Sequence, residues 1–161
     1  MIRHLVPSDF TSILRVVNDA AQAYKGVIPD DRWKEPYMSA EELKQEIEAG
    51  VRFFGWVEDE NLLGVGGIQA IKDTTLIRHT YVVTSFQRKG IGESLVKYLT
   101  SLAKTPTILV GTWANATWAI RFYEKHGFEL VSPKEKDRLL HTYWNIPDRQ
   151  VETSVVLKFI A

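Results

Sequence analysis

Residues 87–92, Gln-Arg-Lys-Gly-Ile-Gly, combine two glycines and two basic residues where the chain changes from one type of element to another. The preceding residues 75–83 are β-branched and aromatic, which is typical of a strand. Residues 91–102 carry apolar side chains at helical spacing. The first N–H groups of a helix lack intrahelical partners and lie at the positive end of its dipole, so they bind anions. The pattern predicts a site for a phosphorylated ligand.

Other interpretations of this glycine loop must be compared with phosphate binding. A Walker A loop needs Gly-Lys followed by Ser or Thr, and the chain has no such run. A dinucleotide fingerprint needs a third glycine where this chain has Leu95, and it normally follows the first strand of its unit. A tight turn from strand to helix, without any ligand, explains Gly90 and Gly92 equally well. The loop alone does not decide between the turn and the anion site.

Composition restricts the classes of function. The 161 residues suit one domain, expected over residues 1–161, and their contents of 45% hydrophobic and 25% charged residues are ordinary. With 20 basic and 20 acidic residues, the formal net charge is zero, which argues against binding nucleic acid or a membrane surface. The chain has no cysteine, which excludes disulfides, thiolate metal sites and a cysteine nucleophile.

The sequence contains neither a targeting segment nor a metal-binding pattern. No apolar run has the length of a membrane span, and the N-terminus shows no signal-peptide pattern, so we expect a cytoplasmic protein. His4, His126 and His141 show no metal-ligand spacing, so no metal site is expected.

The elements that must position the loop follow from periodicity and from glycine and proline breaks. Ser39 and Glu42 form a capping box, Ser8 or Asp9 could cap the first helix, and residues 25–38 are expected to be a loop. Gly64, Gly66 and Gly67 suggest a bulge or a close backbone approach. Strands are expected over 2–6, 52–58, 62–71, 75–83, 107–111, 128–131 and 151–160. Helices are expected over 9–21, 39–50 and 91–105, through 119–123 with an end at Gly127, and around 139–140.

A second motif joins the glycine loop. Residues 119–128, Ala-Ile-Arg-Phe-Tyr-Glu-Lys-His-Gly-Phe, follow Q-x-x-G-x-G by some thirty residues, and the pair resembles the GCN5-related N-acetyltransferases (GNAT). The resemblance is firm over residues 51–131. It implies an α/β fold with a mixed, mostly antiparallel sheet of six or seven strands and helices on both faces. It further implies an enzyme that moves an acetyl group from acetyl-CoA to a primary amine. A non-catalytic acyl-CoA-binding module is the alternative.

The resemblance assigns the cofactor contacts mainly to backbone groups. The pantetheine arm would pair along one strand, whose N–H at Val82 would polarise the acetyl carbonyl. Asn115 stands one residue before the position that the family gives to an asparagine, here Ala116, and it could equally be a turn residue. The pyrophosphate would lie on the loop. The implied cofactor residues are Thr80, Tyr81, Val82, Arg88, Lys89, Gly90, Ile91, Gly92, Glu93 and Asn115.

The catalytic groups are fewer. The resemblance places Tyr123 near the cofactor sulfur, where its phenol is the candidate general acid, although it could instead be an aromatic packed on the sheet. For the general base, three options stay open: His79, whose ordinary pKa is near 6.5, Glu58, and a chain of waters.

The acceptor is expected to be a small-molecule or peptide amine, bound between two groups of side chains. One wall would come from Tyr24, Trp33 and Tyr37, near acidic residues that could attract a cation. The opposite wall would come from Arg138, His141, Tyr143 and Trp144. Homodimers are common in the family, but no residue here specifies an interface.

Overall fold

Seven strands form one sheet in the order β1-β2-β3-β4-β5-β7-β6 in the computed structural model, which describes residues 1–160. Neighbouring strands run antiparallel except for β4 and β5, which run parallel. The predicted mixed, mostly antiparallel sheet is confirmed. The strands are β1 (Ile2–His4), β2 (Arg52–Glu58), β3 (Asn61–Ile71), β4 (Thr74–Val82), β5 (Thr107–Trp113), β6 (Phe128–Leu130) and β7 (Ser154–Phe159).

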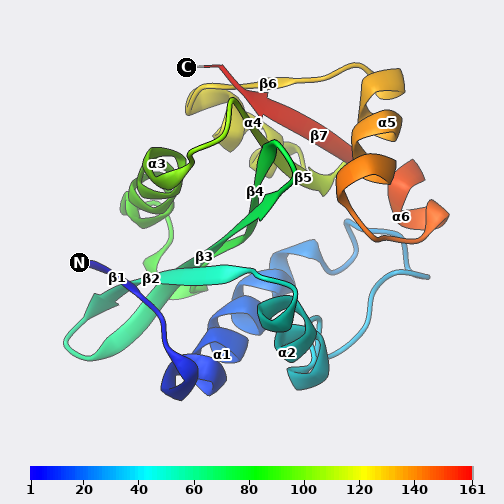
Figure 1. The fold of residues 1–161 in the computed structure, drawn as a ribbon. Helices are drawn as coiled ribbons and strands as arrows, with labels where there is room; N and C mark the ends of the chain where they lie inside the picture. Colours follow the sequence, from blue (N-terminus) through cyan, green and yellow to red (C-terminus); the bar gives the residue numbers. More distant parts are fainter. Residues whose placement is uncertain (161) are drawn as a thin grey trace.

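Helices cover both faces of this sheet, as expected (Figure 1). One face carries α3 and α4, and the other carries α1, α2 and α5, with α6 beside α5. The α-helices are α1 (Phe10–Ala20), α2 (Ala40–Glu48), α3 (Ile91–Leu102), α4 (Thr117–Lys125), α5 (Pro133–Tyr143) and α6 (Asp148–Glu152). Three 3₁₀ turns, η1 (Pro7–Asp9), η2 (Ala21–Tyr24) and η3 (Thr84–Phe86), complete the chain.

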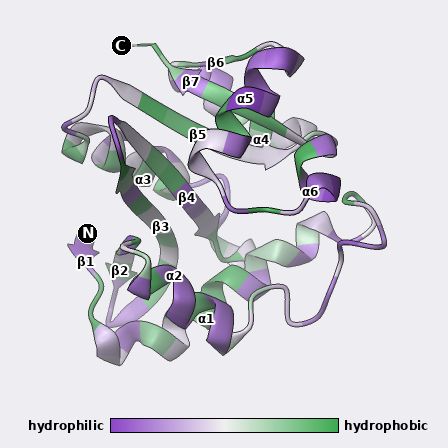
Figure 2. Ribbon diagram, turned by 45° about the vertical axis from the view of Figure 1, so that its right-hand side comes forward, coloured by the Kyte–Doolittle hydropathy of each residue, from purple (hydrophilic) through white to green (hydrophobic). Residues whose placement is uncertain are grey.

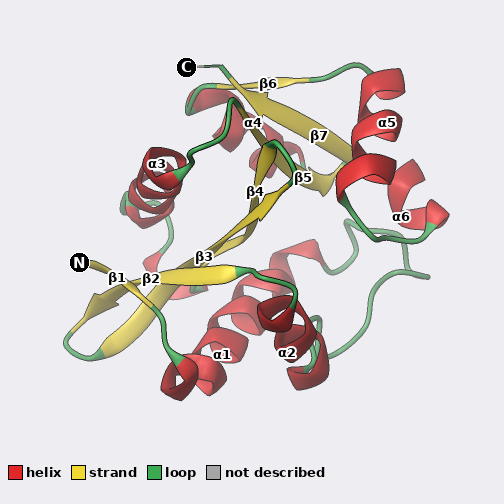
Figure 3. Cartoon of the chain, viewed as in Figure 1, coloured by secondary structure: helices red, strands yellow, loops and turns green. Residues whose placement is uncertain are grey.

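Two features at the ends differ from the sequence prediction. The last strand does not begin at Val151, because α6 occupies residues 148–152 and β7 starts at Ser154 (Figure 3). Neither Ser8 nor Asp9 caps α1 through its side chain. The Asp9 carboxylate instead accepts hydrogen bonds from the Val6 N–H at 2.7 Å and from the guanidinium of Arg3. The capping box of Ser39 and Glu42 at the start of α2 is confirmed.

The core follows the two-residue period of the strands. Leu76 on β4 packs with Leu109, Leu140 and Val156 on the α5 side, while the next residue, Ile77, packs with the α3 and α4 side. Hydrophobic segments accordingly run through the central strands, and polar segments lie on the outer helices (Figure 2). This alternation fixes the register of β4, because a slip of one residue would exchange its two faces.

The glycines of β3 allow α3 to lie close to the sheet, as predicted. A Cβ at Gly64 would stand 2.8 Å from Ile91 Cγ2, and one at Gly66 would stand 2.7 Å from Leu99 Cδ1. Opposite them, the register of β3 and β4 shifts between Val65 and Gly67. On β4 the irregularity falls at His79, whose φ of 54° lies in the left-handed region. This conformation costs a non-glycine residue on the order of 1 kcal/mol.

Candidate active site

The two central parallel strands separate halfway along their length. Pairing of β4 with β5 runs from Thr74–Thr107 to Ile77–Val110, while β4 continues to Val82 and β5 continues to Trp113. Beyond Ile77, one backbone edge of β4 therefore has no strand partner. A cavity of about 120 Å³ lies between the separated strands. Its lining includes Arg78, His79, Thr80 and Tyr81 from β4, Gly111, Thr112 and Trp113 from β5, and Tyr24, Tyr37, Tyr123 and Trp144 from other elements.

The direction of the Val82 N–H follows from its neighbours. The Val83 N–H donates to Leu63 O at 2.9 Å, toward β3. Successive residues of a strand point their N–H groups to opposite sides. The N–H of Val82 consequently points toward the open edge, where the sequence prediction requires it. The carbonyl of Val82 accepts a hydrogen bond from Gln87 Nε2 at 3.0 Å, which ties the glycine loop to the end of β4.

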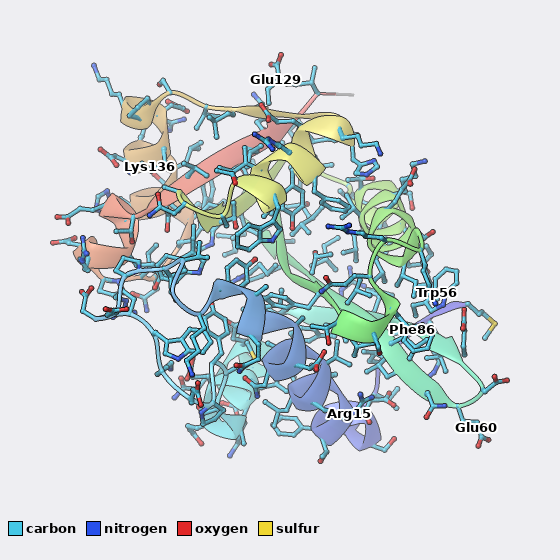
Figure 4. The ribbon with its side chains drawn as sticks, turned by 180° about the vertical axis from the view of Figure 1, so that it is seen from behind. Arg15, Trp56, Glu60, Phe86, Glu129 and Lys136 are labelled. Atoms are coloured by element: carbon cyan, nitrogen blue, oxygen red, sulfur yellow. The ribbon has the colours of Figure 1, made fainter. Side chains whose placement is uncertain are left out.

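The glycine loop turns directly into α3. Gly90 is the N-cap of this helix with φ of 84°, and no side chain caps the helix start. A Cβ at Gly90 would meet nothing within 4 Å, so the surface above the first N–H groups of α3 is open. Lys89 Nζ stands 4.8 Å from the ring centre of Phe86, which Figure 4 labels. The geometry is that of an anion site at a helix N-terminus.

Tyr123 reaches the cavity from α4. Its side chain is buried and packs edge-on against Phe122 and Phe128. Burial raises the pKa of Tyr123 to about 12, and the nearby Thr80 hydroxyl opposes the rise. Thr80 Oγ1 is buried and has no partner that meets hydrogen-bond geometry, so the two hydroxyls are close without being bonded. Tyr123 therefore keeps its proton at neutral pH and has a free O–H to donate.

Three more tyrosines surround the same cavity. The ring of Tyr24 lies 6.1 Å from that of Tyr37 and 6.3 Å from that of Tyr81. Burial raises the pKa of each of these phenols. Tyr37 also accepts a hydrogen bond from Trp113 Nε1 at 3.0 Å, which fastens the loop of residues 25–38 to β5. The structure thus brings two of the predicted wall residues, Tyr24 and Tyr37, to the cavity, and Trp33 packs behind Tyr37.

The opposite wall is only partly as predicted. Trp144 lines the cavity, but the other three residues point elsewhere. Arg138 pairs with Glu135 on the exposed side of α5, and His141 Nδ1 contacts the carbonyl of Asp137. Tyr143 donates a hydrogen bond to Asp73 at 2.8 Å. The prediction put all four residues on one wall, but the helix spreads their side chains around its circumference.

His79 lies on the cavity wall and is bound to a residue that the sequence did not single out. Its Nε2 contacts the carboxylate of Glu46 on α2, and Arg78 Nη2 lies 3.1 Å from the other oxygen of that carboxylate. Burial raises the pKa of Glu46, but the hydrogen bond from His79 and the charges of His79 and Arg78 outweigh it, so the net pKa lies below its usual value. Glu46 sits on a polar face of a helix, and no local pattern distinguishes it from its acidic neighbours.

Two further predicted residues lie away from the cavity. Glu58 is near the tip of the β2–β3 hairpin, which Glu60 marks in Figure 4, and it accepts a hydrogen bond from Trp56 Nε1 at 3.0 Å. Asn115 is exposed in the turn between β5 and α4, and it lines a separate small cavity with Val27 and Thr153.

Over residues 1–160, no group of three or more His, Asp or Glu side chains is arranged to hold a metal ion. None of the helices in that range has the length and apolar character needed to cross a membrane.

Comparison with known families decides what this geometry belongs to. The model of the acetyltransferase (GNAT) domain matches residues 18–144. The chain belongs to the GNAT acetyltransferases. Enzymes of the GNAT family use acetyl-CoA as the acetyl donor, and the separated strands, glycine loop and Tyr123 occupy the matched range. Among curated protein sequences, no significant match is found.

Solved structures support the GNAT fold over the whole chain. PaiA N-acetyltransferase from Thermoplasma acidophilum, in complex with coenzyme A, matches with a TM-score of 0.76 and 18% identity, covering 100% of this chain and 98% of that one. Ribosomal-protein-alanine N-acetyltransferase from Brucella melitensis matches with a TM-score of 0.70 and 18% identity, covering 100% and 99%. N-acetylglutamate synthase from Neisseria gonorrhoeae, with coenzyme A and N-acetyl-glutamate, matches with a TM-score of 0.68 and 18% identity, covering 99% and 34%.

Proposed function

We propose that this protein transfers the acetyl group of acetyl-CoA directly to a primary amine of a small molecule or peptide. The observation that carries the proposal is the buried phenol of Tyr123, which lines the same cavity as Thr80 and Tyr81 on the unpaired edge of β4. The glycine loop is tied to the end of this edge through Gln87 and Val82, and it leads to the open helix start at Gly90. An acyl-CoA-binding protein needs the β4 edge and the helix start but has no use for the protonated phenol.

The residues present fit coenzyme A. The backbone N–H groups of residues 88–93 would hold its pyrophosphate, since the first N–H groups of α3 have no intrahelical partners and the loop above them is open. The edge of β4 at residues 80–82 would pair with the pantetheine arm. Coenzyme A would supply an activated thioester. Arg88 and Lys89, both exposed, add positive charge beside the phosphate site.

Two groups of the chain would stabilise the negative charge that develops on the carbonyl oxygen and on the departing sulfur during acetyl transfer. The Val82 N–H would donate to the carbonyl oxygen, where negative charge grows during attack by the amine. Tyr123 would donate its proton to the departing sulfur. Burial raises the pKa of the phenol, and the same burial disfavours a free thiolate. The pKa values of the proton donor and of the departing thiol are therefore raised together.

The acceptor side is built from aromatic rings. Tyr24, Tyr37 and Tyr81 border the cavity, and Trp144 closes it from the α5 side. Such rings favour a cationic amine over their faces and give apolar contact to the rest of the molecule. The carboxylate of Glu46 is the acidic group beside them, held behind His79.

Release of free thiol from acetyl-CoA, measured across a panel of amines, peptides and amino sugars, tests the proposal. We expect turnover with at least one primary amine. Tight binding of coenzyme A without turnover on any acceptor would show a non-catalytic acyl-CoA-binding protein instead. Failure to bind coenzyme A would contradict the assignment of the glycine loop as well.

A further inference from the structure

The contact between His79 and Glu46 depends on an irregularity in β4. In a regular strand, Arg78 and His79 would point to opposite faces of the sheet. The register shift opposite Gly66 and the φ of 54° at His79 turn both side chains toward α2, where both bind Glu46. The strained backbone at His79 thus brings an imidazole and a carboxylate together on the wall of the cavity.

The carboxylate is held firmly in place. Arg78 Nη2 binds one oxygen of Glu46, while Arg78 Nη1 donates to Gln69 Oε1 at 3.1 Å. Gln69 Nε2 in turn donates to Ala49 O, at the end of α2, at 3.0 Å. The side chains of Glu46, Arg78 and His79 are 20%, 22% and 17% exposed, so the network is largely shielded from water. Helix α2 and strands β3 and β4 together fix where the carboxylate points.

This arrangement determines which ring nitrogen of His79 is available. A carboxylate accepts hydrogen bonds, so neutral His79 carries its proton on Nε2 and donates it to Glu46, which leaves the lone pair on Nδ1. Within residues 1–160, no group forms a hydrogen bond to Nδ1. The ring lines the same cavity as Tyr123. A proton acceptor and a proton donor therefore face one cavity from opposite sides of the sheet.

We propose that Glu46 is a positioning residue for acetyl transfer, which orients His79 so that Nδ1 removes the proton from the acceptor amine. The inference rests on the proposed function. The proton passes from the acceptor nitrogen to Nδ1, and the nitrogen keeps the electron pair with which it attacks the thioester carbon. Glu46 stabilises the resulting imidazolium, which then returns its proton to solvent. His79 is the catalytic base, and Glu46 acts through it.

The charged and titratable groups around His79 are few. Glu46 faces it from α2, and Arg78 and Tyr81 face it from β4. From β2 the neighbour is the apolar ring of Phe53, and from β3 it is the neutral amide of Gln69 through Arg78. Because Tyr81 stays protonated, Glu46 and Arg78 are the charged side chains beside His79. Removing the carboxylate leaves only the positive neighbour.

The test is the pH profile of kcat/KM for Glu46→Gln, with a responsive amine acceptor. We expect kcat to fall about tenfold or more, and the acidic limb of the profile to move to lower pH by about one unit, because the imidazolium loses its counter-charge. Glu48→Gln removes the same charge from an exposed position of α2 and should leave the profile in place. A purely structural network would lower the melting temperature of Glu46→Gln without moving the acidic limb, and that result would overturn the proposal.

A second variant keeps the test valid if Glu46→Gln folds poorly. Glycine adopts the left-handed backbone of residue 79 without strain, so His79→Gly should fold. We expect its kcat/KM to fall about 100-fold, and added imidazole to restore part of the lost rate. No rescue, or a wild-type rate in His79→Gly, would show that His79 is not the base while leaving the acetyl transfer itself established. Absence of turnover in the wild-type protein would instead reject both proposals.

Discussion

Tyr123 joins two properties at the scale of a single side chain. It lies on the cavity between β4 and β5, and burial raises the pKa of its phenol to about 12, so it holds a proton to donate at any physiological pH. We expect Tyr123→Phe to lower kcat by about 100-fold, since general acid catalysis contributes factors of that order. Affinity for coenzyme A should not change, because the ring is retained. Steady-state kinetics and calorimetric titration measure the two effects.

The exposed Tyr98 on α3 offers a matched control for that substitution. Tyr98→Phe removes a hydroxyl far from the cavity and should leave kcat unchanged. If Tyr123→Phe retained the wild-type kcat, the phenol would be a packing residue, and another group or water would have to protonate the leaving sulfur.

Glu46 also makes stability depend on pH. Its pKa is lowered in the folded protein, because the hydrogen bond from His79 and the charges of His79 and Arg78 exceed the opposing effect of burial. The stabilisation is present above the unfolded pKa near 4.5 and is lost as pH falls through the folded value. We expect wild type to exceed Glu46→Gln in free energy of unfolding by about 1–3 kcal/mol at pH 7, with the difference shrinking below pH 4.5. Urea unfolding at several pH values measures it.

Glu48→Gln again serves as the control, since Glu48 is exposed and its replacement should give a difference near zero at every pH. A Glu46→Gln difference that stayed constant from pH 7 to pH 3 would mean that the carboxylate contributes through packing and not through its charge.

At the scale of the element, the junction of the glycine loop with α3 is the anion site that we propose. Gly90 has φ of 84°, so any other residue there is strained, and a comparison must separate strain from charge. Asparagine and aspartate both tolerate this conformation and differ by one charge. We expect Gly90→Asp to bind coenzyme A at least tenfold more weakly than Gly90→Asn, by calorimetry at low salt. The difference in affinity between the two variants should decrease as salt is added, because screening reduces the repulsion between the aspartate and the pyrophosphate.

Equal affinity of the two Gly90 variants at low salt would place the phosphates elsewhere. The position is otherwise permissive, since a Cβ there would meet no atom within 4 Å. A loss of binding in both variants would reflect the backbone rather than the charge, which is why the pair must be compared with each other and not only with wild type.

The elements differ in how far local sequence could predict them. The capping box at Ser39 and the helical apolar spacing of residues 91–102 are local signals, and both elements form as expected. Helix α6 was missed because five residues after Pro147 carry too little periodicity to separate a short helix from a strand. Its effect was to shift the start of the last strand to Ser154.

The residues of the candidate site also differ in how far local sequence could predict them. The loop of residues 87–92, the β4 edge and Tyr123 carry motifs within a few residues. The structure places the β4 edge and Tyr123 at the cavity and ties the loop to the end of β4. Glu46 could not be found, because its partner His79 is 33 residues away and the contact depends on a bulge. Arg138 and His141 are predicted, with Tyr143 and Trp144, to form one wall of the acceptor site, but α5 directs both side chains away from the cavity.

At the scale of the whole molecule, the cavity is bounded by segments from both ends of the chain. The loop of residues 25–38 runs between η2 and α2 (Figure 3). Its side chains form hydrogen bonds to the C-terminal half through the pairs Tyr37–Trp113, Asp31–Arg149 and Arg32–Gln150. Arg149 pairs with Asp31 at 3.0 Å, but both side chains are about half exposed, and such pairs contribute little. The hydrogen bond from Trp113 to Tyr37 lies deeper, beside the cavity, and is the stronger connection.

Trp113→Phe should therefore loosen this loop without removing the cofactor site. Phenylalanine keeps an aromatic ring in the buried position but cannot donate to Tyr37. We expect faster hydrogen exchange in residues 25–38 and a several-fold rise in the KM of the amine, with affinity for coenzyme A retained, because we propose that this loop forms a wall of the acceptor site. Arg149→Gln, which removes the exposed pair, should change neither quantity appreciably. If Trp113→Phe weakened coenzyme A instead of the amine, the loop would belong to the cofactor side of the cavity, and the acceptor would have to enter from the side of α5 and Trp144.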